Sequence, residues 1–239
     1  MQLALNQAKK NLGNTKSNPS VGCVITKNGN LVSVGNTGIG GRPHAEVDAI
    51  NSSKVNLKKS NMYVTLEPCS HYGITPPCTK AIIKSKIRKV FFSLKDPDIR
   101  SFDKSAKILR RYGIKTIYGL LSNRLNEFYK SYFIYKKNYK LPYVTCKLAV
   151  SKDYFTVDKK SKWITNNLSR GRVHLIRSFH DCIVTSSKTV INDNPLLTCR
   201  IPGLEKKSPT RIIIDKYLST PKNSKVILTS KKYKTIIFY

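Results

Sequence analysis

The most constraining feature of this sequence is a hairpin signal followed by a regular alternation of helix-like and strand-like segments. Lys27-Asn28-Gly29-Asn30 separates two short apolar runs, and an Asn-Gly pair between such runs is typical of a tight turn between antiparallel strands. Beyond the hairpin, segments with apolar residues at helical spacing alternate with short apolar runs. This order predicts a sheet that is covered by helices on both faces.

The predicted elements fall into two series. In the first series we expect helices over 2–12, 44–52, 76–86, 105–112 and 121–135, and strands over 21–26, 31–35, 62–66, 90–94 and 114–118. In the second we expect strands over 143–150, 181–185, 211–215, 226–229 and 234–239, and a basic helix over 168–179. The pattern breaks in the polar stretch that ends at Pro142. The sequence therefore predicts an α/β protein with two domains, residues 1–139 and 140–239.

The charge of the chain is extreme, with 44 Lys and Arg against 13 Asp and Glu and a formal net charge of +31. Such a balance is compatible with nucleic-acid binding, or with mutational drift in an AT-rich genome. The positive residues are scattered over the whole length without a polybasic tail, which favours drift, because a nucleic-acid footprint is usually clustered. A positive field would also attract a small phosphorylated substrate.

The chain shows no secretory leader and no apolar run long enough to cross a membrane. We therefore expect a soluble cytoplasmic protein with no membrane partner, whose six cysteines form no disulfides. Most of these cysteines are expected to be small buried residues. Cys69 and Cys78 differ, because each follows a proline in a polar loop.

The informative motif is His44-Ala45-Glu46 followed by Pro68-Cys69 and Pro77-Cys78. One imidazole and two thiolates supply three zinc ligands and leave the fourth position for a water, which then loses a proton near neutral pH. A carboxylate two residues after the histidine can carry that proton without being a ligand. This order is typical of zinc deaminases. The alternative is a helix-capping histidine with two buried thiols, and the joint pattern argues against it.

One departure from the usual deaminase pattern points to a particular family. Residues 70–77 separate the two cysteines, where the usual spacing is two residues. Together with the stretches around the metal motif, this segment resembles the bifunctional riboflavin-pathway deaminase–reductase family; the matching stretches are Asn18-Pro19-Ser20-Val21-Gly22, His44-Ala45-Glu46-Val47, Val64-Thr65-Leu66-Glu67-Pro68-Cys69-Ser70-His71 and Thr75-Pro76-Pro77-Cys78. The resemblance extends over essentially the whole chain.

The resemblance implies a cytidine-deaminase-like three-layer α/β/α domain, followed by a partial dihydrofolate-reductase-like α/β domain. It implies zinc on His44, Cys69 and Cys78, with Glu46 as general acid and base. The implied reaction removes the 2-amino group of a ribosylaminopyrimidinone 5′-phosphate as ammonia. Asn18 and His71 match positions that contact the substrate ring; alternatively they are a turn-forming Asn and an exposed loop histidine. Glu67, at a strand end, is expected to be structural.

From Tyr143 onward the sequence resembles the reductase domain of the same family, which uses NADPH to reduce the ribose. The resemblance implies that the cofactor is lined by Ala149, Trp163, Thr189 and Asp193, and that the substrate is held by Ser161, Arg177, Leu197 and Arg200. No G-x-G-x-x-G is present, so spacing alone predicts no nicotinamide site. Without the resemblance, the sequence predicts that Trp163 is a buried core residue.

Three departures set this half apart from the family pattern. Asp153-Tyr154 replaces an Asp-Gly pair, and Lys216 occupies a small polar position that contacts the cofactor. The sequence also ends at Tyr239, before the family's Gly-rich cofactor-binding segment. We therefore expect a partial reductase domain with impaired NADPH oxidation.

Two other functions compete with the riboflavin-pathway enzyme. The net charge favours a nucleic-acid deaminase of the tRNA type, but the segment between the cysteines does not match that pattern. A basic zinc-stabilised binding module is the third possibility, and an open three-ligand site beside Glu46 argues for chemistry instead. We expect a small phosphorylated substrate, no specific nucleic acid and, as a further possibility, a homo-oligomer.

Overall fold

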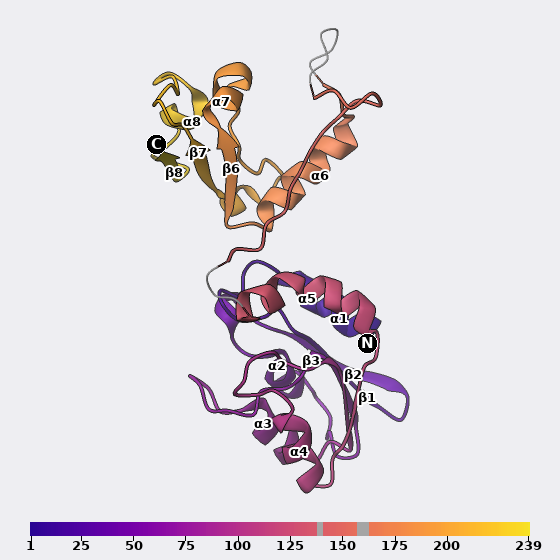
Figure 1. Cartoon of the computed structure of the whole chain (residues 1–239). Coiled ribbons are helices and arrows are strands. Elements are labelled where there is room, and N and C mark those ends of the chain that lie inside the picture. Colours follow the sequence, from indigo (N-terminus) through magenta and orange to yellow (C-terminus); the bar gives the residue numbers. More distant parts are fainter. Residues whose placement is uncertain (138–140, 157–162) are drawn as a thin grey trace. The chain divides into compact units, whose positions relative to one another are not determined.

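The computed structural model describes residues 1–137, 141–156 and 163–239. The chain divides into two compact units, Met1–Thr145 (unit 1) and Cys146–Tyr239 (unit 2) (Figure 1). The predicted domain boundary between residues 139 and 140 falls on the segment 138–140, which lies outside the described residues, and it stays a prediction. Among the described helices, none combines the length and apolar character needed to cross a membrane.

Unit 1 is built on a five-stranded sheet with the strand order β2-β1-β3-β4-β5. The strands are β1 (Gly22–Lys27), β2 (Asn30–Asn36), β3 (Asn61–Leu66), β4 (Lys89–Leu94) and β5 (Lys115–Tyr118). β1 is antiparallel to both β2 and β3, whereas β3, β4 and β5 are parallel. Asn28 and Gly29 have φ values of 52° and 81°, as a two-residue turn with two left-handed positions requires. The predicted hairpin is therefore confirmed.

Helices cover both faces of this sheet. The helices α1 (Gln2–Lys10) and α5 (Ser122–Lys137) lie on one face, and α2 (Ala45–Asn51), α3 (Cys78–Lys84) and α4 (Lys104–Arg111) lie on the other (Figure 1). A short 3₁₀ turn, η1 (Ile39–Gly41), precedes α2. Gly113 follows the C-cap of α4, and its φ of 74° suits the left-handed residue that closes a helix. The three-layer α/β/α arrangement agrees with the predicted class.

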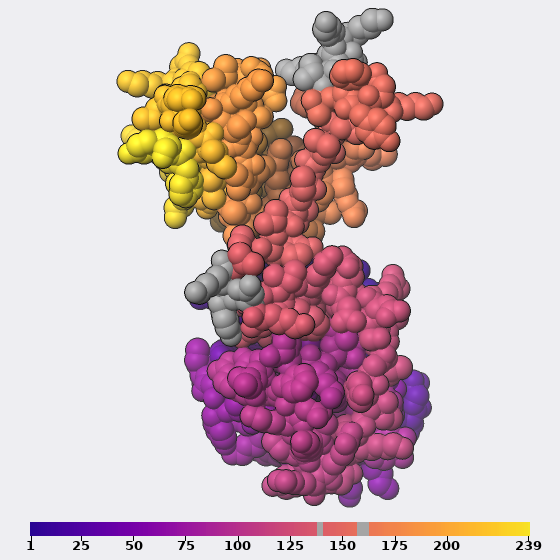
Figure 2. Space-filling view, in the orientation of Figure 1, coloured from indigo at the N-terminus to yellow at the C-terminus, as the bar shows by residue number. Residues whose placement is uncertain are grey.

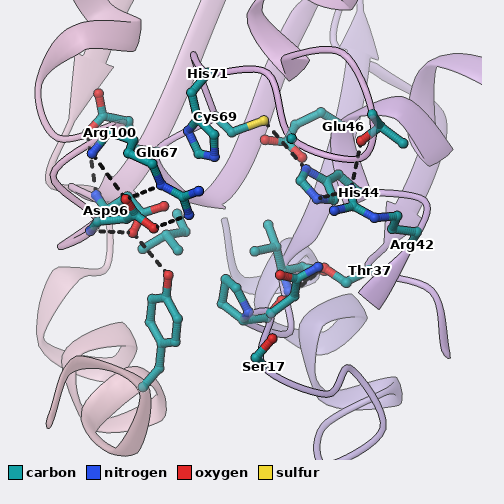
Figure 3. Close-up of a pocket in the computed structure, with 18 of the residues that line it drawn as sticks. Ser17, Thr37, Arg42, His44, Glu46, Glu67, Cys69, His71, Asp96 and Arg100 are labelled. Atoms are coloured by element: carbon teal, nitrogen blue, oxygen red, sulfur yellow. Dashed lines mark hydrogen bonds and ion pairs between the residues drawn. The ribbon is translucent and has the colours of Figure 1, made fainter. Parts of the chain in front are cut away.

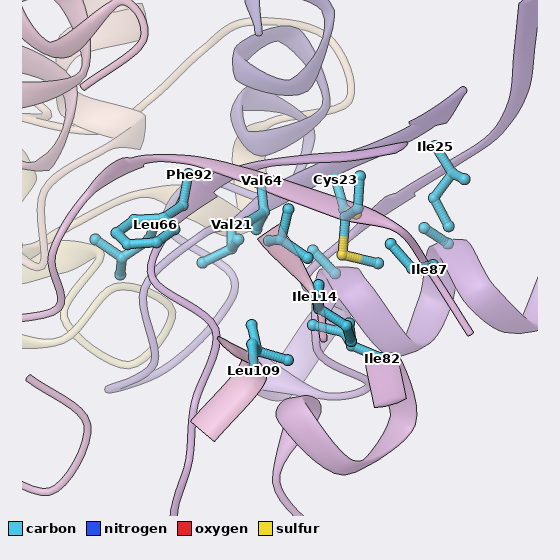
Figure 4. Close-up of a cluster of buried hydrophobic side chains, with 14 of the residues drawn as sticks. Val21, Cys23, Ile25, Val64, Leu66, Ile82, Ile87, Phe92, Leu109 and Ile114 are labelled. Atoms are coloured by element: carbon cyan, nitrogen blue, oxygen red, sulfur yellow. The ribbon is translucent and has the colours of Figure 1, made fainter. Parts of the chain in front are cut away.

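The core of unit 1 lies between the sheet and its helices (Figure 4). Val64 and Leu66 from β3 and Phe92 from β4 are at most 1% exposed, and they pack with Ile82 of α3 and Leu109 of α4. On the other face, the buried Tyr129 of α5 shares a hydrogen bond of 2.6 Å with the Thr65 hydroxyl and donates to the Ser20 carbonyl at 3.0 Å. In the space-filling view, unit 1 presents densely packed side chains on the side shown (Figure 2).

Unit 2 contains a parallel three-stranded sheet with the order β6-β7-β8. Its elements are α6 (Asn167–Ser178), β6 (Cys182–Ser186), α7 (Ser187–Asp193), η2 (Glu205–Lys207), β7 (Thr210–Ile214), α8 (Lys225–Leu228) and β8 (Thr235–Phe238). Val190, Leu197, Ile213 and Val226 form a small apolar core. Arg211 is fully buried beside it. The unit is α/β, as predicted, with a smaller core than unit 1.

Two predicted strands of the second half are wrong. Residues 143–150 pair with no strand in the described chain, and Val144 and Leu148 are 75% and 71% exposed, so an apolar run alone does not produce a strand. Residues 226–229 overlap the helical turn α8, because a short apolar run is compatible with either structure. α7 was not predicted, although Ser186 accepts a bond from the Thr189 amide at its start, a recognisable capping signal.

Candidate active site

The three predicted metal ligands come from two helix starts and one loop of unit 1. His44 is the residue immediately before α2, and Cys78 is the first residue of α3. Cys69 follows the end of β3, where Glu67-Pro68 stops the strand. Pro77 precedes α3 with a φ of −63°, which suits the start of a helix. The chain therefore brings residues that are far apart in sequence to one end of the sheet.

The donor atoms of these residues have the spacing that a tetrahedral metal ion requires. His44 Nδ1 lies 3.3 Å from Cys78 Sγ and 3.6 Å from Cys69 Sγ, and all three atoms lie within 4.8 Å of one another. Zinc bonds of about 2.1 Å to nitrogen and about 2.3 Å to sulfur place tetrahedral N and S ligands about 3.5 Å apart. The residues present therefore fit a zinc ion, with one coordination position left for a water.

The local hydrogen bonds favour the thiolate form of Cys69. The Cys78 amide donates to Cys69 Sγ at 3.2 Å. A hydrogen bond from the Cys78 thiol, together with His44, lowers the pKa of Cys69 to about 4, against an opposing effect of burial. The hydrogen bond between the two thiol groups, together with burial, raises the pKa of Cys78 well above its usual range. Cys69 is thus the more acidic of the two thiols, and thiolates are the form that binds metals.

Glu46 lies beside the three ligands without belonging to them. It is the second residue of α2, only 4% exposed, and it lines the same cavity as His44 and Cys69. Burial raises the pKa of Glu46 to about 7, and the nearby Cys69 adds to this rise. The described His, Cys, Asp and Glu residues that group closely enough here to hold a metal are His44, Cys69 and Cys78. Glu46 is thus positioned to carry a proton within the site.

The cavity beside these residues has a volume of about 250 Å³ (Figure 3). Asn18 and His71, both predicted substrate contacts, line it. The Asn18 amide donates to the Gly41 carbonyl at 3.0 Å, and His71 Nδ1 lies 2.9 Å from the Ser101 hydroxyl. These bonds fix both side chains at the cavity wall. Their roles toward a substrate stay predictions.

Glu67 has a structural position at the end of β3. It is 3% exposed, and its Oε2 accepts hydrogen bonds from the Asp103 amide at 3.1 Å and the Asp96 amide at 3.4 Å. These bonds hold the loop that follows β4 against the strand end. These bonds agree with the structural role expected for Glu67, but the residue also lines the cavity and its role stays a prediction.

Several cavity residues were not predicted from the sequence. They are Arg42, Asp96, Asp98, Arg100, Tyr132 and Lys136. The signal available was weak, because Asp96-Pro97 reads as a strand stop and Lys136 is one of many lysines in a basic chain. Arg42 donates to the Thr75 hydroxyl at 2.7 Å and lies 3.3 Å from His44 Nε2, so it flanks the metal ligands.

Unit 2 has a larger cavity, of about 1070 Å³. Its lining includes all the predicted reductase residues that the structure describes, namely Ala149, Trp163, Arg177, Thr189, Asp193, Leu197 and Arg200. Ser161 lies outside the described residues. Arg177 donates to the Thr198 carbonyl at 3.2 Å, and the Arg170 guanidinium lies 4.7 Å from the centre of the Trp163 ring. Among the residues that the structure describes, the lysines and arginines that line this cavity are Lys147, Arg170, Arg177, Arg200 and Lys225, which suits an anionic ligand.

Comparison with known proteins gives a consistent result for both units. Residues 1–94 match the cytidine and deoxycytidylate deaminase zinc-binding region, and residues 142–239 match the RibD C-terminal domain. The crystal structure of a diaminohydroxyphosphoribosylaminopyrimidine deaminase/5-amino-6-(5-phosphoribosylamino)uracil reductase from Thermotoga maritima is 35% identical. The match has a TM-score of 0.89 and covers 100% of this chain and 68% of that one. The chain belongs to the RibD family.

Curated RibD proteins agree with this assignment. The riboflavin biosynthesis protein RibD of Actinobacillus pleuropneumoniae is 40% identical over 99% of this chain and 63% of that protein. For RibD of Aquifex aeolicus the identity is also 40%, over 97% of this chain and 65% of that protein. The chain thus spans less than two thirds of the length of these relatives. The predicted fold class, a cytidine-deaminase-like domain followed by a dihydrofolate-reductase-like domain, is confirmed.

Proposed function

We propose that unit 1 is a zinc-dependent deaminase of riboflavin biosynthesis, which converts a diaminohydroxyphosphoribosylaminopyrimidine to the corresponding uracil. The observation that carries this proposal is the set of donor atoms on His44, Cys69 and Cys78, within 4.8 Å of one another and beside a buried Glu46. Membership of the RibD family supports the choice of substrate, because the Thermotoga maritima relative is named for this reaction.

The proposed reaction is a hydrolysis in which a ring carbon gains the oxygen of water and loses its amino group as ammonia. Zinc held by the three ligands supplies the Lewis acid that makes water nucleophilic at neutral pH. Glu46 accepts the proton of that water on its carboxylate and delivers protons to the ring nitrogen and to the departing amine. The amide of Asn18 and the ring of His71 hold the pyrimidine at the cavity wall.

We propose further that the cavity of unit 2 binds NADPH and the phosphorylated product, whose ribose is then reduced. Arg177 and Arg200 suit the phosphate, because a guanidinium makes paired hydrogen bonds to phosphate oxygens. Trp163 and Thr189 would line the nicotinamide cofactor. A cytoplasmic location and a homo-oligomer stay predictions.

A nucleic-acid deaminase is the second candidate, and the net charge of +31 is the observation that favours it. In our proposal this charge attracts phosphorylated substrates without selecting RNA. Binding to RNA should then be weak, indifferent to sequence and steeply lost as salt rises. Filter binding across a salt series measures this, and tight binding to one stem-loop at physiological salt would favour the editing function.

The test of the proposed function is to incubate the zinc-loaded chain with the pyrimidinone phosphate and NADPH. Ammonia release and NADPH loss are followed together, so that each unit has its own readout. Release of ammonia at a rate proportional to bound zinc supports the deaminase. The substitution Trp163→Ala should raise the Kd for NADPH about tenfold, because it removes an aromatic ring that can stack on the cofactor. Ammonia release should not change, because Trp163 lies in unit 2. Tyr217→Ala, at an exposed position outside the cavity, is the control.

A further inference from the structure

The cavity of unit 1 has two ends with different chemistry. Figure 3 places His44, Glu46 and Arg42 at one end and Arg100, Asp96 and Glu67 at the other, with Cys69 and His71 between them. The reacting amino group must lie at the first end, beside the metal ligands. The ring and the ribose separate that amino group from the 5′-phosphate of the proposed substrate. The phosphate is therefore expected at the second end.

The second end holds two cations on one carboxylate. Asp98 Oδ1 accepts a hydrogen bond from Arg100 Nε at 2.9 Å, and Asp98 Oδ2 accepts one from Arg100 Nη2 at 2.6 Å, which makes a paired contact. The Lys136 ammonium lies 3.1 Å from the same Oδ2. The contact with Arg100, reinforced by Lys136, holds the pKa of Asp98 well below its usual range. Two cations against the Asp98 carboxylate leave one net positive charge on this group of three side chains, while Asp96 and Glu67 add two further carboxyl groups to the same end.

Both cations retain donors for a ligand. Arg100 donates to Asp98 from Nε and Nη2. Within the described part of the chain, Arg100 Nη1 makes no hydrogen bond to protein. The Lys136 ammonium has three donors and uses one of them on Asp98. The side chains of Arg100 and Lys136 are 59% and 15% exposed, whereas that of Asp98 is 10% exposed. The carboxylate thus orders the two cations, and their free donors are available to an anion.

The other acidic groups at this end are turned inward. Asp96 is 8% exposed and accepts hydrogen bonds from the Tyr132 hydroxyl at 3.1 Å and the Asp98 amide at 3.0 Å. Glu67 accepts backbone amides, as described above. Arg42 is the competing cation of the cavity, but it flanks His44 and therefore lies where the ring must bind. These positions leave Arg100 and Lys136 as the groups that face a ligand at the second end.

We propose that Arg100 and Lys136, ordered by Asp98, form the phosphate-binding subsite of the unit 1 cavity. We call Arg100 and Lys136 the cation pair. The subsite takes the phosphate dianion of a ribosylated pyrimidine and makes unit 1 selective for the phosphorylated substrate over the free riboside. This inference rests on the proposed deaminase function, and it names the residues of the cavity that bind the phosphate.

The test compares two substrates that differ only in the phosphate: the pyrimidinone phosphate and the riboside made from it with a phosphatase. Ammonia release gives kcat/KM for each. Arg100→Ala and Lys136→Ala should each lower kcat/KM for the phosphate about tenfold or more, the scale of one charge-assisted hydrogen bond, and leave the riboside unchanged. Arg100→Lys should keep part of the preference, because it keeps the charge without the paired contact.

Matched controls use exposed basic residues on neighbouring helices. Lys130→Ala lies on the same helix as Lys136, and Arg111→Ala lies at the end of α4. Both remove a positive charge from unit 1 without touching the cavity lining. If these controls lower the phosphate preference as much as the cation pair does, the effect belongs to the general field of the protein and the subsite is overturned.

A second measurement separates this inference from the proposed function. Ribose 5-phosphate, but not ribose, should shift the NMR signals of the Arg100 and Ser101 backbone amides, and Lys136→Ala should abolish the shift. A shift without any ammonia release would support the subsite and overturn the deaminase. Ammonia release with an intact phosphate preference in both variants would overturn the subsite and leave the deaminase standing. A preference lost instead in Arg42→Ala would place the phosphate at the metal end and overturn the subsite.

Discussion

Units 1 and 2 each hold a cavity, and the two cavities differ in how their residues are placed. The unit 1 cavity, of about 250 Å³, is built around ligands at the starts of α2 and α3 and a buried Glu46. The unit 2 cavity is about 1070 Å³ and is lined by Arg177, Arg200 and other long basic side chains from loops and helix faces. The first arrangement suits a reaction at one atom, whereas the second suits recognition of large anions.

The two cavities also differ in how well a sequence motif predicts the residues that line them. Chemistry at a metal restricts residue types and spacing, so His44, Cys69 and Cys78 stand out in the sequence. A cavity that binds an anion accepts an arginine from several positions, so Arg177 and Arg200 were assigned only through family resemblance. Variants that affect one unit and spare the other therefore test whether the two cavities work independently.

The largest expected effect is the loss of the metal site. Cys78→Ser should abolish zinc binding and lower ammonia release about 10³-fold or more, because the metal supplies several kcal/mol of transition-state stabilisation. NADPH binding by unit 2 should not change. Metal analysis of the purified chain, expected to give about one zinc per wild-type chain, is the measurement. Cys182→Ser, which replaces an exposed cysteine of unit 2, is the control. Full zinc retention in Cys78→Ser would contradict the ligand assignment.

The next effect separates chemistry from metal binding within unit 1. Glu46→Gln should retain zinc and fold normally, while deamination falls roughly 10²-fold or more, because the amide cannot carry the proton. Glu127→Gln, an exposed position on α5, controls for the loss of a negative charge. Zinc content and ammonia release are measured on the same samples. Normal deamination by Glu46→Gln would show that another group moves the protons.

The sequence predicted unit 1 more completely than unit 2, for identifiable reasons. The turn at Asn28-Gly29 and the cap at Gly113 depend on local backbone preferences, which the sequence carries directly. The run at Val226 was misread because the choice between strand and helix was made by tertiary packing, which buries that side chain completely. Asp98 and Lys136 were missed because they meet only when α5 packs against the loop after β4.

The third prediction concerns the polar core of unit 2. Arg211 Nη2 donates to the Val226 carbonyl at 2.8 Å and to the Tyr233 carbonyl at 2.9 Å, and Arg211 Nη1 donates to the Leu196 carbonyl at 3.1 Å. Arg211→Met would remove a charged donor from these three carbonyls, of which those of Val226 and Tyr233 keep a contact with the Thr235 hydroxyl, and should lower the free energy of unfolding of unit 2 by about 3 kcal/mol. Trp163 is the single tryptophan of the chain and lies in unit 2, so its fluorescence in urea reports this unfolding. Ammonia release should remain normal.

The smallest loss of stability is expected from a buried tyrosine hydroxyl in the core of unit 1. The Tyr129 hydroxyl joins the Thr65 hydroxyl at 2.6 Å to the Ser20 carbonyl at 3.0 Å, linking α5 to β3 and to the segment before β1. Tyr129→Phe keeps the ring and removes one neutral hydroxyl, so we expect a loss of about 1 kcal/mol. Circular dichroism in urea, together with the urea dependence of ammonia release, measures unit 1. The comparison with Arg211→Met is the test, because the loss of a charged donor to three carbonyls should lower the free energy of unfolding more than the loss of one neutral hydroxyl. Equal losses in the two variants would mean that the Arg211 carbonyls find other donors, and that the two cores differ less than their contacts indicate.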